Sequence, residues 1–430
     1  MPAFDDRRRR SHVATLLLAA LLPCGCAAPR VDRPPRPGET PRDARWRADL
    51  AFLAHELPAR HVAPFFHCPR ARFVAAVAAL DRDIPAFDDS QIIAGLMHLT
   101  AMIGDAHTGI QEIGELPQFA AAPLRLGWFR DGYYCVGAPA ESGLHGARLT
   151  RVAATDVATI EQRLGDFWPW QNVAERHDVA PQLLTIPRLL MAAGIAPRGD
   201  SVPQTFVDAA GRERRFNAAP APAVGASRPA SGRRAPPFAE HRREPYWYEF
   251  LPDRSALYLA YNRCDDAARF RAVCGKMWRD FDRLRPRIVV VDLRRNGGGN
   301  SAVLLPFRAG LLLRPALWSR GAVRVLIGRG TYSSAMMNAL ELRRAGAVLV
   351  GEPTGGKPNA YGEVRTFELP HCRLHVAYST RYFRLVPADP ESVTPDVAVE
   401  PTIDDWLAGR DPVLDAALVE RVASAPLPAR

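Results

Sequence analysis

Apolar residues recur at intervals of three and four along residues 43–111. This spacing places apolar side chains on one face of a helix, so it predicts three successive amphipathic helices. We therefore expect a small helical domain over residues 43–111. Its candidate core positions are Trp46, Leu50, Leu53 and Leu57, then Phe73, Val77 and Leu80, then Ile92, Leu96, Leu99 and Ile103.

The pattern changes to that of strands over residues 112–218. Two apolar stretches flank Arg130-Asp131-Gly132, which is typical of a β-hairpin. Residues 146–152 and 202–216 are further strand candidates, and residues 185–195 between them have helical character. We predict a compact β-rich module, followed by a segment over 219–244 whose Ala, Pro and Arg content is typical of a linker or a lid.

Short apolar strands alternate with helical segments from about residue 245 to 425. The strand candidates are residues 255–262, 287–294, 323–328 and 347–352, and helices are expected at 266–284, after Asn300 and after Ser333. This alternation predicts an α/β layer fold with parallel strands.

Composition narrows the class of protein. A chain of 430 residues with 47% hydrophobic content is long enough for two or three globular parts and is not a disordered protein. The formal net charge is +10, but the basic residues are spread along the chain without a nucleic-acid-binding signature. We expect no nucleic-acid partner.

The first 26 residues are typical of a bacterial export signal. Arg7 to Arg10 are followed by a short apolar stretch from Val13 to Leu22, which is too short to span a bilayer. Gly25-Cys26 resembles the end of a lipobox, with Cys26 as the lipid acceptor, and the Pro-rich residues 27–42 suit a tether. We therefore expect an exported, lipid-anchored protein of the cell envelope or periplasm, with plain signal cleavage as the alternative.

A Gly-rich turn, Gly297-Gly298-Gly299, follows the apolar stretch 288–293. Consecutive glycines let the backbone approach a ligand closely and direct N–H groups at negative charge. Neither a Walker lysine nor a spaced G-x-G-x-x-G pattern is present, so nucleotide binding has little support. The turn suits an oxyanion site or a simple strand-to-helix connection.

Ser333 and Ser334 stand where an apolar strand meets a helix-forming run. Serine is a preferred helix N-cap, so a capping role is the simpler interpretation. The same junction also gives a serine the exposure that a nucleophile needs. Their position alone leaves both interpretations open.

Two further side chains are candidates for a general base. Lys276 and Lys357 are the two lysines among 56 basic residues, and Lys357 follows a Gly-Gly pair. Unlike arginine, a lysine can lose its proton, so Lys357 is a candidate base. His107 lies in a loop after the third helix. The run of His55, His61, His67 and Cys68 lacks metal-ligand spacing, so we expect no metal site.

Four motifs occur in a fixed order: "DAHT" (105–108), "DLRRNGGG" (292–299), "TYSSA" (331–335) and "GEPTGGK" (351–357). Together they resemble the tail-specific (C-terminal-processing) and tricorn-core serine peptidase family over most of residues 43–410. The resemblance implies an α/β, ClpP/crotonase-like catalytic domain over 245–425, preceded by the helical N-terminal domain and by a PDZ-like module at 112–218.

The resemblance also implies roles for individual residues. Ser333 matches the family nucleophile, and the oxyanion hole would combine the N–H of Ser334 with that of Gly297 or Gly298. Tail-specific members use a lysine as the base, which here is Lys357. Tricorn-like members use a histidine oriented by a glutamate, which here are His107 and Glu391, although Ala106 stands where their pattern has a serine. We favour His107 with Glu391 and keep Lys357 as the alternative.

The sequence thus predicts an exported serine endopeptidase that acts on proteins or peptides through an acyl-enzyme and needs no cofactor. A non-catalytic peptide- or ligand-binding lipoprotein and an acyl-CoA hydrolase-like enzyme on the same scaffold are the alternatives.

Overall fold

A computed structural model describes residues 36, 38–111, 113–221, 244–319 and 321–419. The predicted signal segment with Cys26, most of the tether and most of the 219–244 segment lie outside the described residues.

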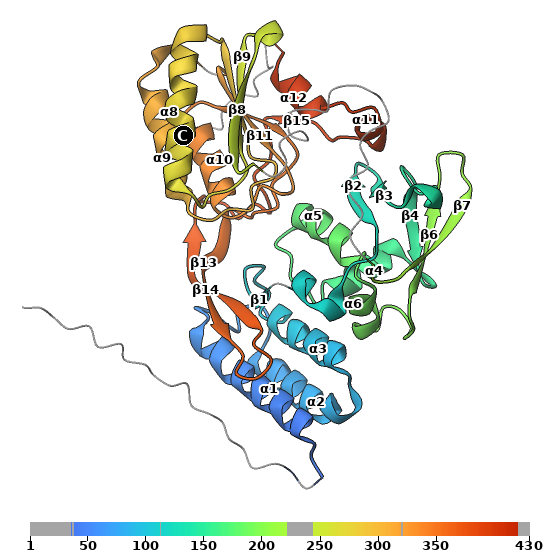
Figure 1. Ribbon diagram of the computed structural model, residues 1–430. Helices are drawn as coiled ribbons and strands as arrows, with labels where there is room; N and C mark the ends of the chain where they lie inside the picture. Colours follow the sequence, from blue (N-terminus) through green and yellow to red (C-terminus); the bar gives the residue numbers. More distant parts are fainter. Residues whose placement is uncertain (1–35, 37, 112, 222–243, 320, 420–430) are drawn as a thin grey trace, which may run out of the picture.

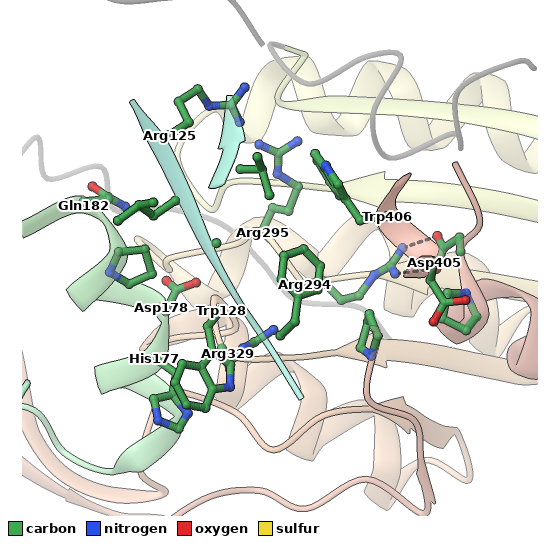
Figure 2. Close-up of a pocket in the computed structure, with 18 of the residues that line it drawn as sticks. Arg125, Trp128, His177, Asp178, Gln182, Arg294, Arg295, Arg329, Asp405 and Trp406 are labelled. Atoms are coloured by element: carbon green, nitrogen blue, oxygen red, sulfur yellow. Dashed lines mark hydrogen bonds and ion pairs between the residues drawn. The ribbon is translucent and has the colours of Figure 1, made fainter. Parts of the chain in front are cut away.

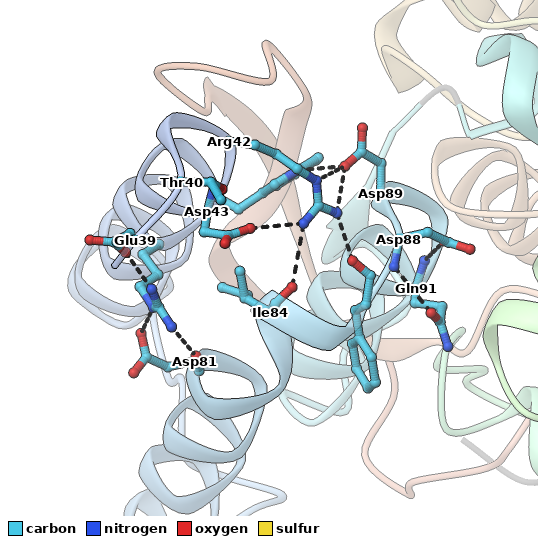
Figure 3. A network of polar contacts seen from close by, with 12 residues as sticks. Glu39, Thr40, Arg42, Asp43, Asp81, Ile84, Asp88, Asp89 and Gln91 are labelled. Atoms are coloured by element: carbon cyan, nitrogen blue, oxygen red, sulfur yellow. Dashed lines mark hydrogen bonds and ion pairs between the residues drawn. The ribbon is translucent and has the colours of Figure 1, made fainter. Parts of the chain in front are cut away.

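Three helices form the N-terminal part, as the apolar spacing predicts: α1 (Pro41–Arg60), α2 (Arg70–Asp83) and α3 (Asp89–Ala101). Thr40 caps α1, and Asp88 caps α3 in a reciprocal pair with Gln91. Arg42 ties the start of α1 to the connection between α2 and α3 (Figure 3). Its guanidinium donates to Asp43, to Asp89 and to the carbonyl of Phe87, at 2.9, 2.9 and 2.7 Å. These contacts hold the start of α1 against the start of α3 and the segment that precedes it.

A long hairpin of β13 (Asn359–Glu368) and β14 (His375–Arg384) extends from the α/β part onto these helices (Figure 1). With β1 (Gly109–Ile110) it forms a three-stranded antiparallel sheet in the order β1-β14-β13. Phe367 packs edge-on against Phe52 of α1, with ring centroids 5.9 Å apart. At the hairpin turn, Asp49 of α1 accepts the backbone N–H groups of His371 and Cys372, each at 2.8 Å. The hairpin therefore connects the first and last thirds of the chain.

The β-rich module contains the predicted hairpin around residues 130–132, formed by β2 and β3. Its sheet has the order β2-β3-β4-β6-β7, with β5 paired to β4. The strands are β2 (Arg125–Phe129), β3 (Gly132–Gly137), β4 (Arg148–Val152), β5 (Thr155–Asp156), β6 (Val202–Val207) and β7 (Glu213–Ala218). The helices are α4 (Val157–Leu164), α5 (Val173–Leu183) and α6 (Pro187–Ala192). Helix α5 lies beside β2 (Figure 1).

The α/β part is built on a six-stranded sheet in the order β15-β12-β11-β10-β9-β8. All neighbouring pairs are parallel except β8–β9, which confirms the predicted layer fold. The strands are β8 (Tyr246–Leu251), β9 (Ala256–Tyr261), β10 (Ile288–Asp292), β11 (Val323–Ile327), β12 (Val348–Gly351) and β15 (Val397–Ala398). The helices are α8 (Ala267–Leu284), α9 (Leu305–Leu312), α10 (Ser334–Arg344), α11 (Ile403–Leu407) and α12 (Pro412–Ala417).

Both faces of this sheet are covered, which explains why its central strands are apolar throughout. Val289 and Val291 of β10 face a core shared with α8, α9 and α10, whereas Ile288 and Val290 face a smaller core shared with α12. The carboxyl ends of β10, β11 and β12 therefore lie together at one edge, where connecting loops can form a site.

Short 3₁₀ helices complete the described elements: Ile84–Ala86, Ile113–Glu115, Pro117–Phe119, Ala140–Ser142, Pro252–Arg254, Ser301–Leu304 and Pro315–Leu317. Across the described ranges, no helix combines the length and apolar character needed to cross a bilayer.

Candidate active site

Ser333 occupies a strained position between β11 and α10. Its backbone has φ 49° and ψ −123°, a conformation that costs a non-glycine residue about 1–3 kcal/mol. Its side chain makes no capping hydrogen bond to the described part of the chain. It instead lines a cavity of about 720 Å³ together with His107, Gly297 and Lys357, which we call the serine cavity. The structure therefore does not support a capping role for Ser333.

The Gly-rich turn packs directly against this serine. Gly298 has φ 107°, and a Cβ atom there would lie 2.7 Å from the Cβ of Ser333 and 3.0 Å from the backbone N of Ser334. Ser334 donates its hydroxyl to the carbonyl of Gly299 at 2.6 Å, which fastens the turn to the start of α10. Only glycine allows this close approach.

The buried side chain of Asn296 shapes the turn and distinguishes the two predicted oxyanion donors. Its Oδ1 accepts the N–H of Gly298 at 2.9 Å, and its Nδ2 donates to the carbonyl of Tyr261 at 2.8 Å. The amide of Gly298 is therefore engaged within the turn. Gly297 and Ser334, by contrast, line the serine cavity.

His107 reaches the serine cavity from the loop between α3 and β1. Its Nδ1 lies 3.3 Å from the hydroxyl of Tyr332 and 3.4 Å from Nε2 of Gln171. Its Nε2 is buried and has no hydrogen-bond partner among the described residues. A ring nitrogen without a partner, in the wall of the cavity that Ser333 lines, suits a general base that accepts a hydroxyl proton.

Asp105 is a buried carboxylate beside His107 that the sequence interpretation did not single out, although it belongs to "DAHT". It accepts hydrogen bonds from the hydroxyls of Ser379 and Thr108, at 2.6 and 2.7 Å, and lies 3.2 Å from Nε2 of His61. Burial alone would raise the pKa of Asp105, but its hydrogen bonds with His107, His61 and Ser379 hold that pKa well below its usual value. Asp105 Oδ1 lies 3.8 Å from His107 Nδ1.

Lys357 is held as a cation. Its Nζ lies 3.1 Å from Asp389 Oδ2 and 3.3 Å from Glu391 Oε1. Burial would lower the pKa of Lys357, but the two carboxylates raise it above its ordinary value. A lysine that keeps its proton at neutral pH cannot accept one from Ser333, so the geometry speaks against the lysine-base arrangement.

Glu391 pairs with Lys357 in the structure, and its predicted role in orienting His107 stays a prediction. Its carboxylate is largely exposed and lies 3.3 Å from the ammonium group of Lys357. The backbone carbonyl of Glu391 accepts a 2.7 Å hydrogen bond from Asn172. The polar groups next to His107 Nδ1 are instead Tyr332 and Gln171.

The start of α5 supplies site residues that the sequence interpretation missed. Asn172 caps α5 through a 2.8 Å bond from the N–H of Glu175, and its amide donates to the carbonyls of Thr354 and Gly355, at 3.2 and 3.0 Å. Gln171 Oε1 accepts the N–H of Lys357 at 2.8 Å. An Asn followed three residues later by Glu is a helix-start signal that would have located the helix but not its contacts.

A second cavity, of about 410 Å³, is lined by β2, by α5 and by loops of the α/β part (Figure 2). We call it the arginine cavity because Arg125, Arg294, Arg295 and Arg329 line it. The guanidinium of Arg294 is bound by Asp292 and Asp411, at 2.6 and 2.8 Å. Arg329 pairs with Glu352 through Nη2 at 3.2 Å, whereas its Nη1 is buried without a hydrogen-bond partner among the described residues.

Comparisons with protein-family models and with curated protein sequences give no match. Among solved structures, mature CPAF is similar, with a TM-score of 0.58 and 14% identity over 88% of this chain and 97% of that chain. Mature CPAF complexed with lactacystin has a TM-score of 0.56 and 13% identity, over 86% and 97%. The photosystem II D1 C-terminal processing protease has a TM-score of 0.42 and 14% identity, over 87% and 98%. The chain thus shares the mixed α/β fold of CPAF.

Proposed function

We propose that this protein is a serine endopeptidase with Ser333 as its nucleophile and His107 as its general base. The observation that carries the proposal is the shared wall of the serine cavity. A strained serine that caps nothing in the described chain and a histidine with a partner-free Nε2 line the same space. A helix cap would require neither the strain nor the histidine.

In the proposed reaction, His107 Nε2 takes the proton of Ser333 as its hydroxyl oxygen attacks the peptide carbonyl. The N–H groups of Gly297 and Ser334 stabilise the negative oxygen, and each such donor contributes about 3–4 kcal/mol to acyl transfer. His107 then gives the proton to the leaving amine. Water hydrolyses the acyl-enzyme by the same route. The negative charge of Asp105 stabilises the imidazolium in both steps.

A polypeptide substrate suits the walls of the serine cavity. Pro358, just before β13, and residues 360–364 of β13 line it, and β13 is the outer strand of its sheet. An extended peptide can add to such an edge through main-chain hydrogen bonds. Met336, Met337 and Leu385 make part of the cavity wall apolar.

The finer organisation and the location belong to the same proposal. We infer a helical N-terminal domain, a PDZ-like module and a ClpP/crotonase-like catalytic domain, exported and anchored through Cys26. The signal-like sequence and the element order support this assignment.

The proposal is tested by incubating the wild-type chain and Ser333→Ala with unfolded proteins and identifying new termini by mass spectrometry. We expect termini from the wild type that Ser333→Ala does not produce. Ser334→Ala is the matched control, because it keeps the backbone N–H and should lose far less activity. If the wild type and Ser333→Ala are both folded and neither produces new termini, the binding lipoprotein is favoured. Turnover of thioesters without peptide cleavage would favour the acyl-CoA hydrolase-like enzyme.

A further inference from the structure

A histidine that acts as a base through Nε2 must carry its neutral-state proton on Nδ1. In the structure, two side-chain groups lie within 3.5 Å of His107 Nδ1, the amide nitrogen of Gln171 and the hydroxyl of Tyr332, and Oδ1 of Asp105 lies farther away, at 3.8 Å. Which of them acts on Nδ1 decides which nitrogen remains free for the serine proton.

Gln171 favours the unproductive form. Its Oε1 accepts the backbone N–H of Lys357 at 2.8 Å, so its Nε2 must be the atom that faces His107. An amide NH₂ donates and does not accept. Acting alone, Gln171 would make Nδ1 an acceptor and place the proton on Nε2.

Tyr332 can reverse this preference because a hydroxyl both donates and accepts. The buried carboxyl of Glu175 lies close to this hydroxyl, and the ring of Tyr332 lies over the imidazole with centroids 4.8 Å apart. When Tyr332 donates its proton to Glu175, the hydroxyl oxygen keeps a lone pair for the Nδ1–H of His107. Burial, followed by the nearby charge of Glu175, raises the pKa of Tyr332 well above its usual value, so the hydroxyl keeps its proton.

Two backbone hydrogen bonds hold Glu175 in place. Its Oε2 accepts the backbone N–H of Gln171 at 2.6 Å, and its own backbone N–H is bound by the cap residue Asn172. The carboxyl is therefore held at the first turn of α5, with Tyr332 as a partner for its remaining hydrogen-bonding capacity.

We propose that Tyr332, held by Glu175, is the positioning residue that sets the orientation and tautomer of His107. This inference rests on the proposed peptidase function. Tyr332 takes the role that the resemblance implies for Glu391, and Asp105 acts separately through its charge. The tyrosine precedes the nucleophile in the chain, so one short loop would place both the attacking group and the group that prepares its base.

The test uses Tyr332→Phe in the full chain, which keeps the ring and removes the hydroxyl. Tyr258→Phe is the matched control, since that buried hydroxyl also bonds a carboxylate, Asp292 at 2.6 Å, and Tyr258 does not line the serine cavity. The first readout is the ¹⁵N NMR signal of the His107 ring, assigned by its loss in His107→Ala. It reports the tautomer without any substrate.

We expect the wild type and Tyr258→Phe to carry the neutral-state proton on Nδ1 and Tyr332→Phe to shift it toward Nε2. The second readout is the rate at which a fluorophosphonate labels Ser333, which should fall about 10- to 100-fold in Tyr332→Phe and stay within about twofold in Tyr258→Phe. An unchanged tautomer and labelling rate in Tyr332→Phe would overturn the inference while leaving the serine nucleophile in place. A wild type that labels no faster than Ser333→Ala would instead overturn the proposed function, and the NMR signal would still decide the role of Tyr332.

Discussion

The serine cavity and the arginine cavity differ in the chemistry of the polar groups that line them. In the arginine cavity, Arg294 is bound by two buried aspartates, and Trp128 stacks on His177 with centroids 3.5 Å apart. In the serine cavity, His107 Nε2 has no partner within the described chain, and Ser333 is strained. Nη1 of Arg329 also lacks a partner among the described residues, so the difference lies in the chemistry of the two groups. Paired charges such as those around Arg294 stabilise a fold, whereas an unpartnered imidazole nitrogen and a strained serine in one cavity are typical of a reaction site.

The largest expected effect is the loss of catalytic rate in His107→Ala. Loss of a general base lowers rates by about 10²- to 10⁴-fold, so kcat on a cleaved peptide should fall by this factor with little change in the free energy of unfolding. His371→Ala is a suitable control, because His371 lies at the hairpin turn and does not line the serine cavity. A drop of less than tenfold in His107→Ala would contradict the assigned role of the serine cavity.

In the arginine cavity, Arg294→Met should act on stability. It leaves Asp292 and Asp411 buried without their cation, which costs about 3–5 kcal/mol and should appear as a lower urea midpoint. Arg410→Met also removes an arginine of this cavity, but Arg410 is exposed and pairs with Asp405, so about 1 kcal/mol or less is expected. Equal urea midpoints for the two variants would show that the buried ion pairs of Arg294 contribute no more to stability than an exposed ion pair.

Two buried carboxyls around His107 should respond to pH with opposite signs. The folded-state pKa of Asp105 lies well below 3.8, so its stabilisation is present above that pH and is lost as the pH falls. Asp105→Asn should therefore destabilise the protein by about 1–3 kcal/mol at pH 7, and less in acid.

For Glu175, burial raises the pKa well above 4.5, so the folded protein pays for ionising it as the pH rises. Glu175→Gln removes this titration. The difference between the melting temperature of this variant and that of the wild type should therefore shift in favour of the variant as the pH rises above 4.5. Melting temperatures of both variants measured across pH 4–8 check the two signs. Parallel curves would contradict the described environments of the two carboxyls.

The smallest effect is expected from Lys357→Met. The ammonium pairs with two exposed carboxylates, and such pairs contribute about 0–1 kcal/mol, so kcat/KM should change by no more than about fivefold. A loss of two orders of magnitude, with the fold intact, would restore the lysine-base arrangement and contradict His107.

Local pattern was enough to predict the three helices, the parallel α/β layer and the Gly-rich turn, because each depends on residues close in sequence. The hairpin over 359–384 was not predicted, since its partners are the helices some 300 residues away. The roles of Gln171, Tyr332 and Glu175 were missed for the same reason. The charge state of Lys357 depends on Asp389, a surface residue that no motif marks.

The proposed peptidase function requires Ser333 to be a reactive nucleophile. The most direct test of this requirement locates a covalent adduct. The full chain is treated with a fluorophosphonate and digested, and the modified residue is identified by mass spectrometry. We predict one modified peptide, with the label on Ser333, and its loss in His107→Ala. A folded protein that takes up no label, or takes it up on Ser334 or another serine, would contradict the account.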